Sequence, residues 1–353
     1  MRTWGHAESV KHIILRREPM KRRDFIGKTL AGSVLAPAIA HAAGQEENRK
    51  QPALDFTQRG RVIVERAVAG RPHAGQVLAA IQPHVDDIPI FAGGTVAKLI
   101  EEGYTGYLIR TTNDEMAGAG TTGEVVLHNE RDNDAVAKAL GLQKVFNLEY
   151  RNHLLDGVSP LDIRGRLIFL FRLLKVDTVI CYDPWGLYEE NPDHYVTAKA
   201  VEAACWMAGM DKDYPEQLAS GLQPHKVQEK YYFARGPQLV NRVVDISAAI
   251  DKKVEANLAN VTQGPAGENG ARLRARLAAQ RKQLPILGSD DATANRHYIK
   301  EFVLDYDSEF LRGVPSDREV GRPYGLEWAE AFHYIGPGTS KLAQYIADHA
   351  VSL

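Results

Sequence analysis

The sequence has little cysteine, no excess of charge of either sign and no long apolar run, and each shortage excludes a class of protein. Two cysteines in 353 residues exclude a disulfide scaffold or a cysteine-rich zinc module. With 43 Lys and Arg against 45 Asp and Glu, the chain lacks the basic excess of a broad nucleic-acid-binding surface. No run of about 18 apolar residues occurs, so we expect no permanent membrane span. The sequence predicts a soluble globular protein.

The amino-terminal segment differs from the rest of the chain. Lys21, Arg22 and Arg23 precede a weakly apolar stretch over residues 25–40, and small residues follow at 40–42. This order is typical of an export signal with a signal-peptidase site, and the paired arginines resemble the twin-arginine signal. A disordered amphipathic tail is the alternative. We expect export by the twin-arginine machinery to the periplasm or the exterior.

This interpretation sets the expected domain boundaries. Residues 1–42 would be the leader and signal peptide, 43–60 a polar linker, and 61–353 a single domain of ordinary size for an elaborated α/β fold. In the exported protein, Cys181 and Cys205 lie in an apolar run and a helix-like run. Two buried free thiols are therefore favoured over a bridge, although spacing alone does not decide it.

Apolar runs alternate with helical segments after the linker. Strands are expected at 76–82, 106–110, 144–148 and 178–181, and helices at 95–102, 135–140 and 164–175. Such alternation indicates a Rossmann-like, doubly wound, mostly parallel sheet with helices on both faces. Because ligands bind beyond the carboxyl ends of such strands, the polar stretches 83–87, 111–115 and 182–194 should be neighbours.

Two of these stretches carry metal-ligating residue types. His84, Asp86 and Asp87 follow the first strand and His194 follows the fourth. Imidazole nitrogen and carboxylate oxygen are normal zinc ligands, and a catalytic zinc commonly takes three protein ligands. The first stretch alone is better explained by a capped turn. The second histidine loop, beyond another strand of the same sheet, favours a metal site.

These motifs resemble a known family. PHVDDIPIFAGGT and NPDHYVTAKAV are similar to the two metal motifs of the PIG-L/LmbE-like N-acetylglucosamine deacetylases. The loop YDPWGLYEENPDH is similar to that of the mycothiol-pathway deacetylase. The resemblance spans most of residues 76–335. It implies that His84, Asp87 and His194 hold Zn²⁺ and that Asp86 is the general base for the attacking water.

The same resemblance suggests roles for neighbouring residues. Tyr188 would donate to the developing oxyanion or form an aromatic wall of the pocket. Asn191 stands where the family has a histidine, and it can hydrogen-bond but cannot shuttle a proton. Asp193 would orient His194 or cap a turn. Ile88 replaces a common family glutamate, which suggests different hydroxyl contacts there.

Other polar residues near the expected site have less specific explanations. Asn113 and Asp114 would contact substrate or cap a turn. Isolated histidines are expected to be structural, and these are His128, His153, His225 and His333. The resemblance implies a zinc-dependent hydrolase that removes an N-acetyl group from an amino sugar or glycoconjugate. The alternatives are a noncatalytic glycan-binding protein of the same fold and a metal-dependent hydrolase of another amide or ester.

Overall fold

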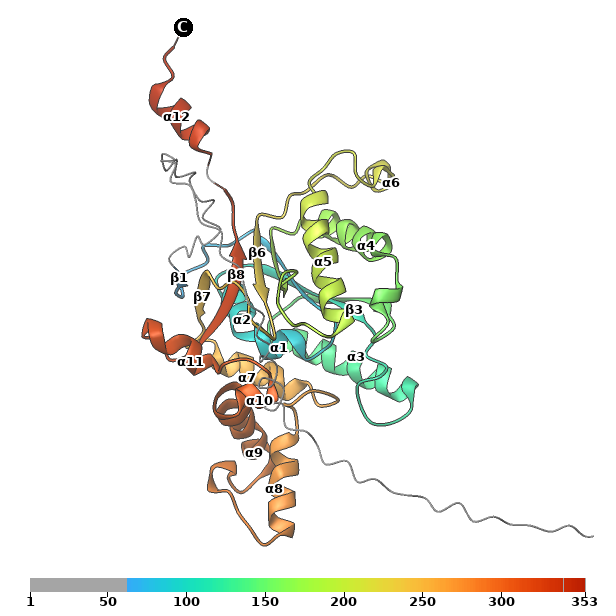
Figure 1. Cartoon of the computed structure of the whole chain (residues 1–353), viewed down its shortest axis with the longest axis vertical. Helices are drawn as coiled ribbons and strands as arrows, with labels where there is room; N and C mark the ends of the chain where they lie inside the picture. The colour runs from blue at the N-terminus through green and yellow to red at the C-terminus, as the bar shows by residue number, and fades with distance from the viewer. Residues whose placement is uncertain (1–61, 339, 353) are drawn as a thin grey trace, which may run out of the picture. The chain divides into compact units, whose positions relative to one another are not determined.

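An eight-stranded mixed sheet organises the part of the chain that the computed structural model describes, residues 62–338 and 340–352 (Figure 1). The predicted signal peptide and linker lie outside the described residues. The strand order is β1-β7-β8-β6-β5-β2-β3-β4. The strands are β1 (Ile63–Glu65), β2 (Val77–Gln82), β3 (Thr105–Thr112), β4 (Lys144–Tyr150), β5 (Thr178–Tyr182), β6 (Glu229–Phe233), β7 (Arg242–Asp245) and β8 (Ala329–Ile335).

Helices follow nearly every strand. They are α1 (Asp87–Phe91), α2 (Gly93–Glu101), α3 (Thr122–Ala139), α4 (Pro160–Leu174), α5 (Pro192–Met207), α6 (Pro215–Ala219), α7 (Ile250–Ala259), α8 (Asn269–Ala279), α9 (Asp291–His297), α10 (Ser308–Leu311), α11 (Asp317–Gly321) and α12 (Lys341–His349). A π-helical segment, Tyr298–Tyr306, joins α9 to α10. Within the described residues, none of the helices combines the length and apolarity needed to cross a bilayer.

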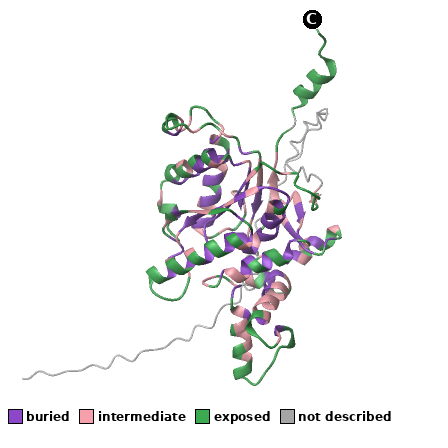
Figure 2. Cartoon of the chain, turned by 180° about the vertical axis from the view of Figure 1, so that it is seen from behind, coloured by how far each residue is buried: buried purple, intermediate pink, exposed green. Residues whose placement is uncertain are grey.

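The centre of the sheet is buried on both faces. Strand β5 is buried throughout, and Leu78 to Ile81 of β2 are fully inaccessible (Figure 2). Helices α4 and α5 pack against each other, and α7 packs against both α2 and α3. Because parallel crossovers are right-handed, the helices that lead outward from β2 and those that lead back cover opposite faces. This explains why the central strands read as continuous apolar runs rather than alternating ones.

The chain changes direction at β2. It runs from β2 to β3 and β4 on one side and then returns to place β5 on the other side of β2. The loops after β2 and β5 therefore diverge and leave a crevice at the carboxyl edge of the sheet. This topological switch point is where the two predicted metal motifs emerge.

The expected fold class is confirmed, but strands β1 and β8 were not predicted, and α3 begins at Thr122 rather than near residue 135. Strand β8 pairs antiparallel with both β6 and β7, so it joins the parallel part of the sheet to β7 and β1. Cys181 and Cys205 are both buried and unpaired, as the sequence favoured.

Candidate active site

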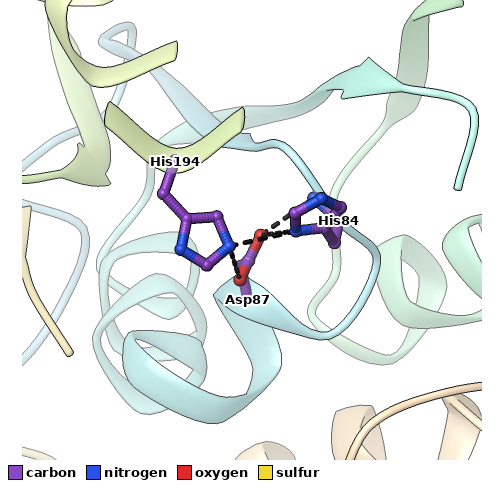
Figure 3. Close-up of side chains that lie close together, drawn as sticks. All are labelled: His84, Asp87 and His194. Carbon is purple, nitrogen blue, oxygen red and sulfur yellow. Dashed lines mark hydrogen bonds and ion pairs between the residues drawn. The ribbon is translucent and has the colours of Figure 1, made fainter. Parts of the chain in front are cut away.

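Two loops supply the residues of the site. The first leaves β2, turns at His84 and enters α1, and the His84 backbone N–H donates to the Asp87 side chain at 2.8 Å. The second leads from β5 into α5, where the Asn191 side chain caps the helix by accepting from the Asp193 backbone N–H at 3.0 Å. These local bonds place Asp87 and His194 in the first turns of their helices (Figure 3).

His84, Asp87 and His194 converge on one point. His84 Nδ1 lies 3.0 Å from His194 Nε2, and each nitrogen lies 3.5 Å from an oxygen of Asp87. Tetrahedral zinc with ligand bonds of about 2.0–2.2 Å separates its ligands by roughly 3.4 Å. All three side chains are buried, and their spacing fits a single bound cation.

The outer nitrogens of both histidines face carboxylates. Asp193 Oδ2 lies 3.0 Å from His84 Nε2, and Glu189 Oε2 lies 3.1 Å from His194 Nδ1. Carboxylates there favour protons on the outer nitrogens, which leaves the two inner lone pairs pointing at each other. Three carboxylates surround the two imidazoles, counting Asp87. Both the lone pairs and the negative charge suit a divalent cation, so the donor set fits zinc.

The two adjacent aspartates differ electrostatically. Burial opposes ionisation of Asp87, but contacts with His194, His84 and Tyr182 hold its pKa at about 2. Desolvation and the nearby negative charge of Asp87 raise the pKa of Asp86 to about 7. One carboxylate is thus ionised throughout the neutral range, while its neighbour can exchange a proton near neutral pH.

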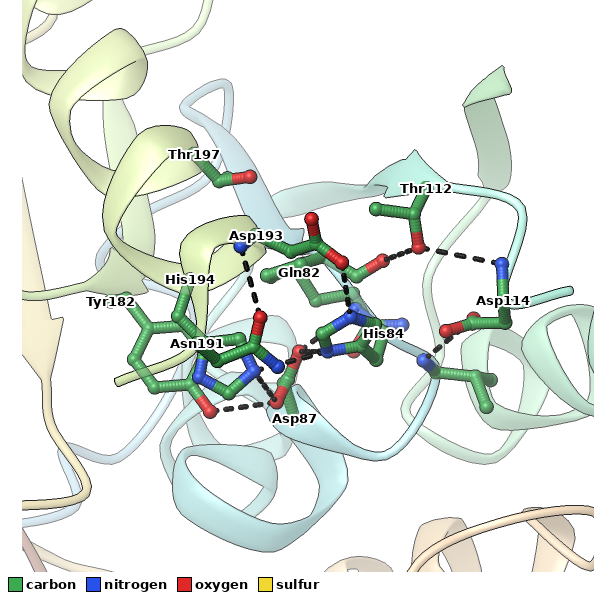
Figure 4. A network of polar contacts seen from close by, with 12 residues as sticks. Gln82, His84, Asp87, Thr112, Asp114, Tyr182, Asn191, Asp193, His194 and Thr197 are labelled. Carbon is green, nitrogen blue, oxygen red and sulfur yellow. Dashed lines mark hydrogen bonds and ion pairs between the residues drawn. The ribbon is translucent and has the colours of Figure 1, made fainter. Parts of the chain in front are cut away.

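Asp193 orients a different histidine from the one predicted. It contacts His84 rather than His194, and it also accepts from the Asn152 side chain and from the backbone of His153 and Leu155 (Figure 4). The reason is tertiary: Asp193 reaches His84 in the loop from β2, whereas the outer nitrogen of His194 faces Glu189 in the loop that precedes α5.

Sequence reasoning missed several supporting residues. Tyr182 donates to Asp87 at 2.7 Å and stacks on His194. Glu189 faces His194 and also pairs with Arg235. Burial opposes its ionisation, but His194 and Arg235 hold the pKa of Glu189 at about 2. Glu189 lies in the EENPDH loop, so its position in the sequence could have suggested a role beside His194. Arg235 follows β6, and no motif in the sequence links it to the site.

A cavity of about 220 Å³ opens over His84, Asp87 and His194, the three residues of the candidate metal cluster. Asp86 and Asn191 line it beside the three predicted ligands, and so does the exposed His153, which sequence reasoning set aside as structural. Gly264 comes so close that a Cβ there would lie 2.7 Å from Asp86 Oδ2. Since its φ is +77°, glycine is needed both for the turn and for the close approach.

Tyr188, Asn113 and Asp114 lie elsewhere. Tyr188 is 88% exposed and does not line the cavity, so this geometry gives no contact for its predicted oxyanion role. Asn113 accepts from the Glu115 backbone, and Asp114 accepts from the Val85 backbone and pairs with Arg110. Both side chains hold the loop after β3 together. Ile88 is fully buried and presents nothing to the cavity.

The cluster at the switch point is a candidate metal site in an α/β protein, and comparisons with known proteins show what the chain is similar to. Residues 79–205 match the PIG-L family, described as GlcNAc-PI de-N-acetylase. Diacetylchitobiose deacetylase of Thermococcus kodakarensis is 29% identical over 52% of this chain and 69% of its own length. A deacetylase of 1D-myo-inositol 2-acetamido-2-deoxy-alpha-D-glucopyranoside from Mycolicibacterium smegmatis is 25% identical over 64% and 90%.

Solved structures support the fold. The N,N'-diacetylchitobiose deacetylase of Pyrococcus horikoshii superposes with a TM-score of 0.56 at 22% identity, over 74% of this chain and 84% of that one. A 4-carboxy-2-hydroxymuconate hydratase from Pseudomonas putida gives 0.52 at 16% identity, over 75% and 98%. The chain therefore has a PIG-L-type region and deacetylase homologues, while its fold also occurs in a hydratase. The function must be argued from the site.

Proposed function

We propose that this protein is a zinc-dependent hydrolase that removes the N-acetyl group from an N-acetylglucosamine-type sugar or glycoconjugate. The observation that carries the proposal is the pair of histidine nitrogens facing each other at 3.0 Å beside Asp87, with Asp86 lining the same cavity. A noncatalytic glycan-binding protein would have no use for a proton-exchanging carboxylate next to an open metal site.

His84, Asp87 and His194 would hold the ion, which supplies Lewis acidity toward the amide carbonyl and toward water. Asp86 takes the proton of the attacking water and returns it to the departing amine. Its pKa of about 7 suits both transfers, because an acid-base group works best near the ambient pH. The Asn191 side-chain nitrogen has no hydrogen-bond partner among the described residues, so it can donate to the reacting amide or to a sugar hydroxyl.

The test is acetate release from N-acetylglucosamine glycosides by the zinc-loaded protein, compared with Asp86→Asn. Loss of the general base should lower kcat by about 10²–10⁴-fold while the protein still binds one zinc. His84→Ala should lose the zinc as well. A protein that binds no zinc, or an Asp86→Asn variant as active as the parent, would exclude this mechanism. Unimpaired glycan binding without acetate release would favour the noncatalytic alternative.

We also propose that the chain is exported by the twin-arginine route. The support is the Arg22-Arg23 pair with the apolar stretch and small residues that follow. Fractionation of cells that express the parent chain and a variant with both arginines changed to lysine tests this. We expect the parent in the periplasm or medium, with residues 20–42 removed, and the variant retained. Cytoplasmic parent protein that keeps those residues would exclude export.

A further inference from the structure

A second cavity lies beside the site, at the same edge of the sheet. Its volume is about 480 Å³, about twice that of the cavity over the metal cluster. It lies beyond the end of β6, between the segment that follows Phe233, the start of β8 and helix α11. Figure 1 shows α11 next to β7 and β8 at this edge.

The two cavities share a wall. Phe91 and Arg312 line both of them. The Phe91 ring stacks on Phe233 at 5.5 Å and meets Tyr182 at 5.9 Å, and Tyr182 in turn donates to Asp87. Phe91 therefore stands between the two cavities, and Tyr182 connects its ring to Asp87.

Arg312 fixes the other part of this wall. Its side chain is only 1% exposed, and its guanidinium donates to Ile90 O at 3.0 Å and pairs with Asp317 at 2.9 Å. Since its charge is already paired, Arg312 does not offer a binding site for an anion. It ties the end of α10 to the end of α1 and to the start of α11.

Most of the second cavity is apolar. Phe233, Val240, Val314 and Val320 line it together with small residues and prolines. Its polar side chains are Gln238, Arg312, Asp317 and Glu330. The cavity opens to the surface, since Val240, Val314 and Val320 are only partly buried, and a mostly apolar hollow of this size is typical of a ligand site. We propose that this cavity binds an apolar group of the substrate, so that the preferred substrate is an amino sugar that carries an alkyl or aryl substituent.

This inference rests on the proposed function, and the apolar group has two possible sources. It belongs either to the aglycone or to a long acyl chain on the amine. Three substrates separate these sources: methyl N-acetyl-glucosaminide, its octyl glycoside, and the methyl glycoside with an N-octanoyl group. Binding to the zinc-loaded protein by calorimetry and turnover by amine release are measured for each.

We expect one of the two octyl-bearing compounds to bind at least about tenfold more tightly than the N-acetyl methyl glycoside, because burying even a few methylene groups gives that gain. Val320→Trp and Val314→Trp, which fill the cavity from two walls, should abolish the preference and leave the affinity for the methyl compound unchanged. Leu239→Trp is the matched control, since Leu239 is 55% exposed and does not line the cavity.

The outcomes distinguish the two proposals. Equal binding of all three compounds, or a preference that survives both tryptophan variants in folded protein, overturns the apolar subsite. If an octyl compound binds more tightly but none of the three compounds releases its amine, the deacetylase proposal is overturned and the apolar subsite is kept. Circular dichroism and thermal unfolding show whether each variant is folded. If one tryptophan variant misfolds, the binding data of the other variant test the subsite.

Discussion

Replacing Asp193 with asparagine tests whether the buried carboxylates position the metal ligands. Asp193 Oδ2 accepts from His84 Nε2, the Asn152 side chain and the His153 backbone, and Oδ1 accepts from the Leu155 backbone at 3.3 Å. Burial opposes ionisation, but bonds from His84 and the His153 backbone hold the pKa of Asp193 below its ordinary value. The substitution therefore removes a real negative charge at neutral pH.

The magnitude follows from these contacts. An asparagine has one acceptor oxygen, so its NH₂ group must face at least one of the donors that Asp193 now satisfies. One buried unsatisfied donor costs about 1–3 kcal/mol of folding free energy. Removing a carboxylate from a ligating histidine weakens metal affinity by about 10–100-fold, which corresponds to about 1.4–2.7 kcal/mol.

The assay is zinc affinity by competition with a chelator, together with urea unfolding. Asp183→Asn is the matched control, because Asp183 is a buried aspartate whose Oδ2 lies 3.2 Å from His333, outside the metal cluster. It should lose stability but keep its zinc affinity. If Asp193→Asn binds zinc as tightly as the parent, or if the control loses as much affinity, the positioning argument is refuted.

Three further predictions rest on other features. Gly264→Ala should lower kcat by about 100-fold or more and keep the zinc, because its Cβ would displace the Asp86 carboxylate; unchanged acetate release would contradict this. Lys253→Met should lose about 3–5 kcal/mol in urea unfolding, since the fully buried Lys253 pairs with two buried carboxylates at 2.7 Å; a loss below about 1 kcal/mol would show the network to be dispensable. Burial raises the pKa of both Cys181 and Cys205, so their reactive thiolates form only above the ordinary pH range. A thiol reagent at pH 9 should therefore react at least about tenfold faster with the urea-unfolded chain than with the folded one, and equal rates would place the thiols at the surface.

The strands and the two metal motifs were predictable because their signals are local. The apolar run of β2 spans 77–82 and that of β5 spans 178–182, within a residue or two of the expected positions. His84, Asp87 and His194 could be proposed as partners because both loops follow strands whose carboxyl ends share an edge. The antiparallel strand β8 was not predicted, because strand direction depends on pairing with distant segments rather than on residue pattern.

The sequence by itself determined the fold class, the residue types that converge at the sheet edge and the absence of any cysteine-based alternative for a metal. The tertiary structure decided which carboxylate faces which histidine: Asp193 pairs with His84, and Glu189 with His194. It also placed Tyr188 in solvent and brought Gly264 against Asp86. These pairings depend on loop backbone geometry and on contacts between segments that lie many residues apart. Neither can be predicted from periodicity or local motifs in a single sequence.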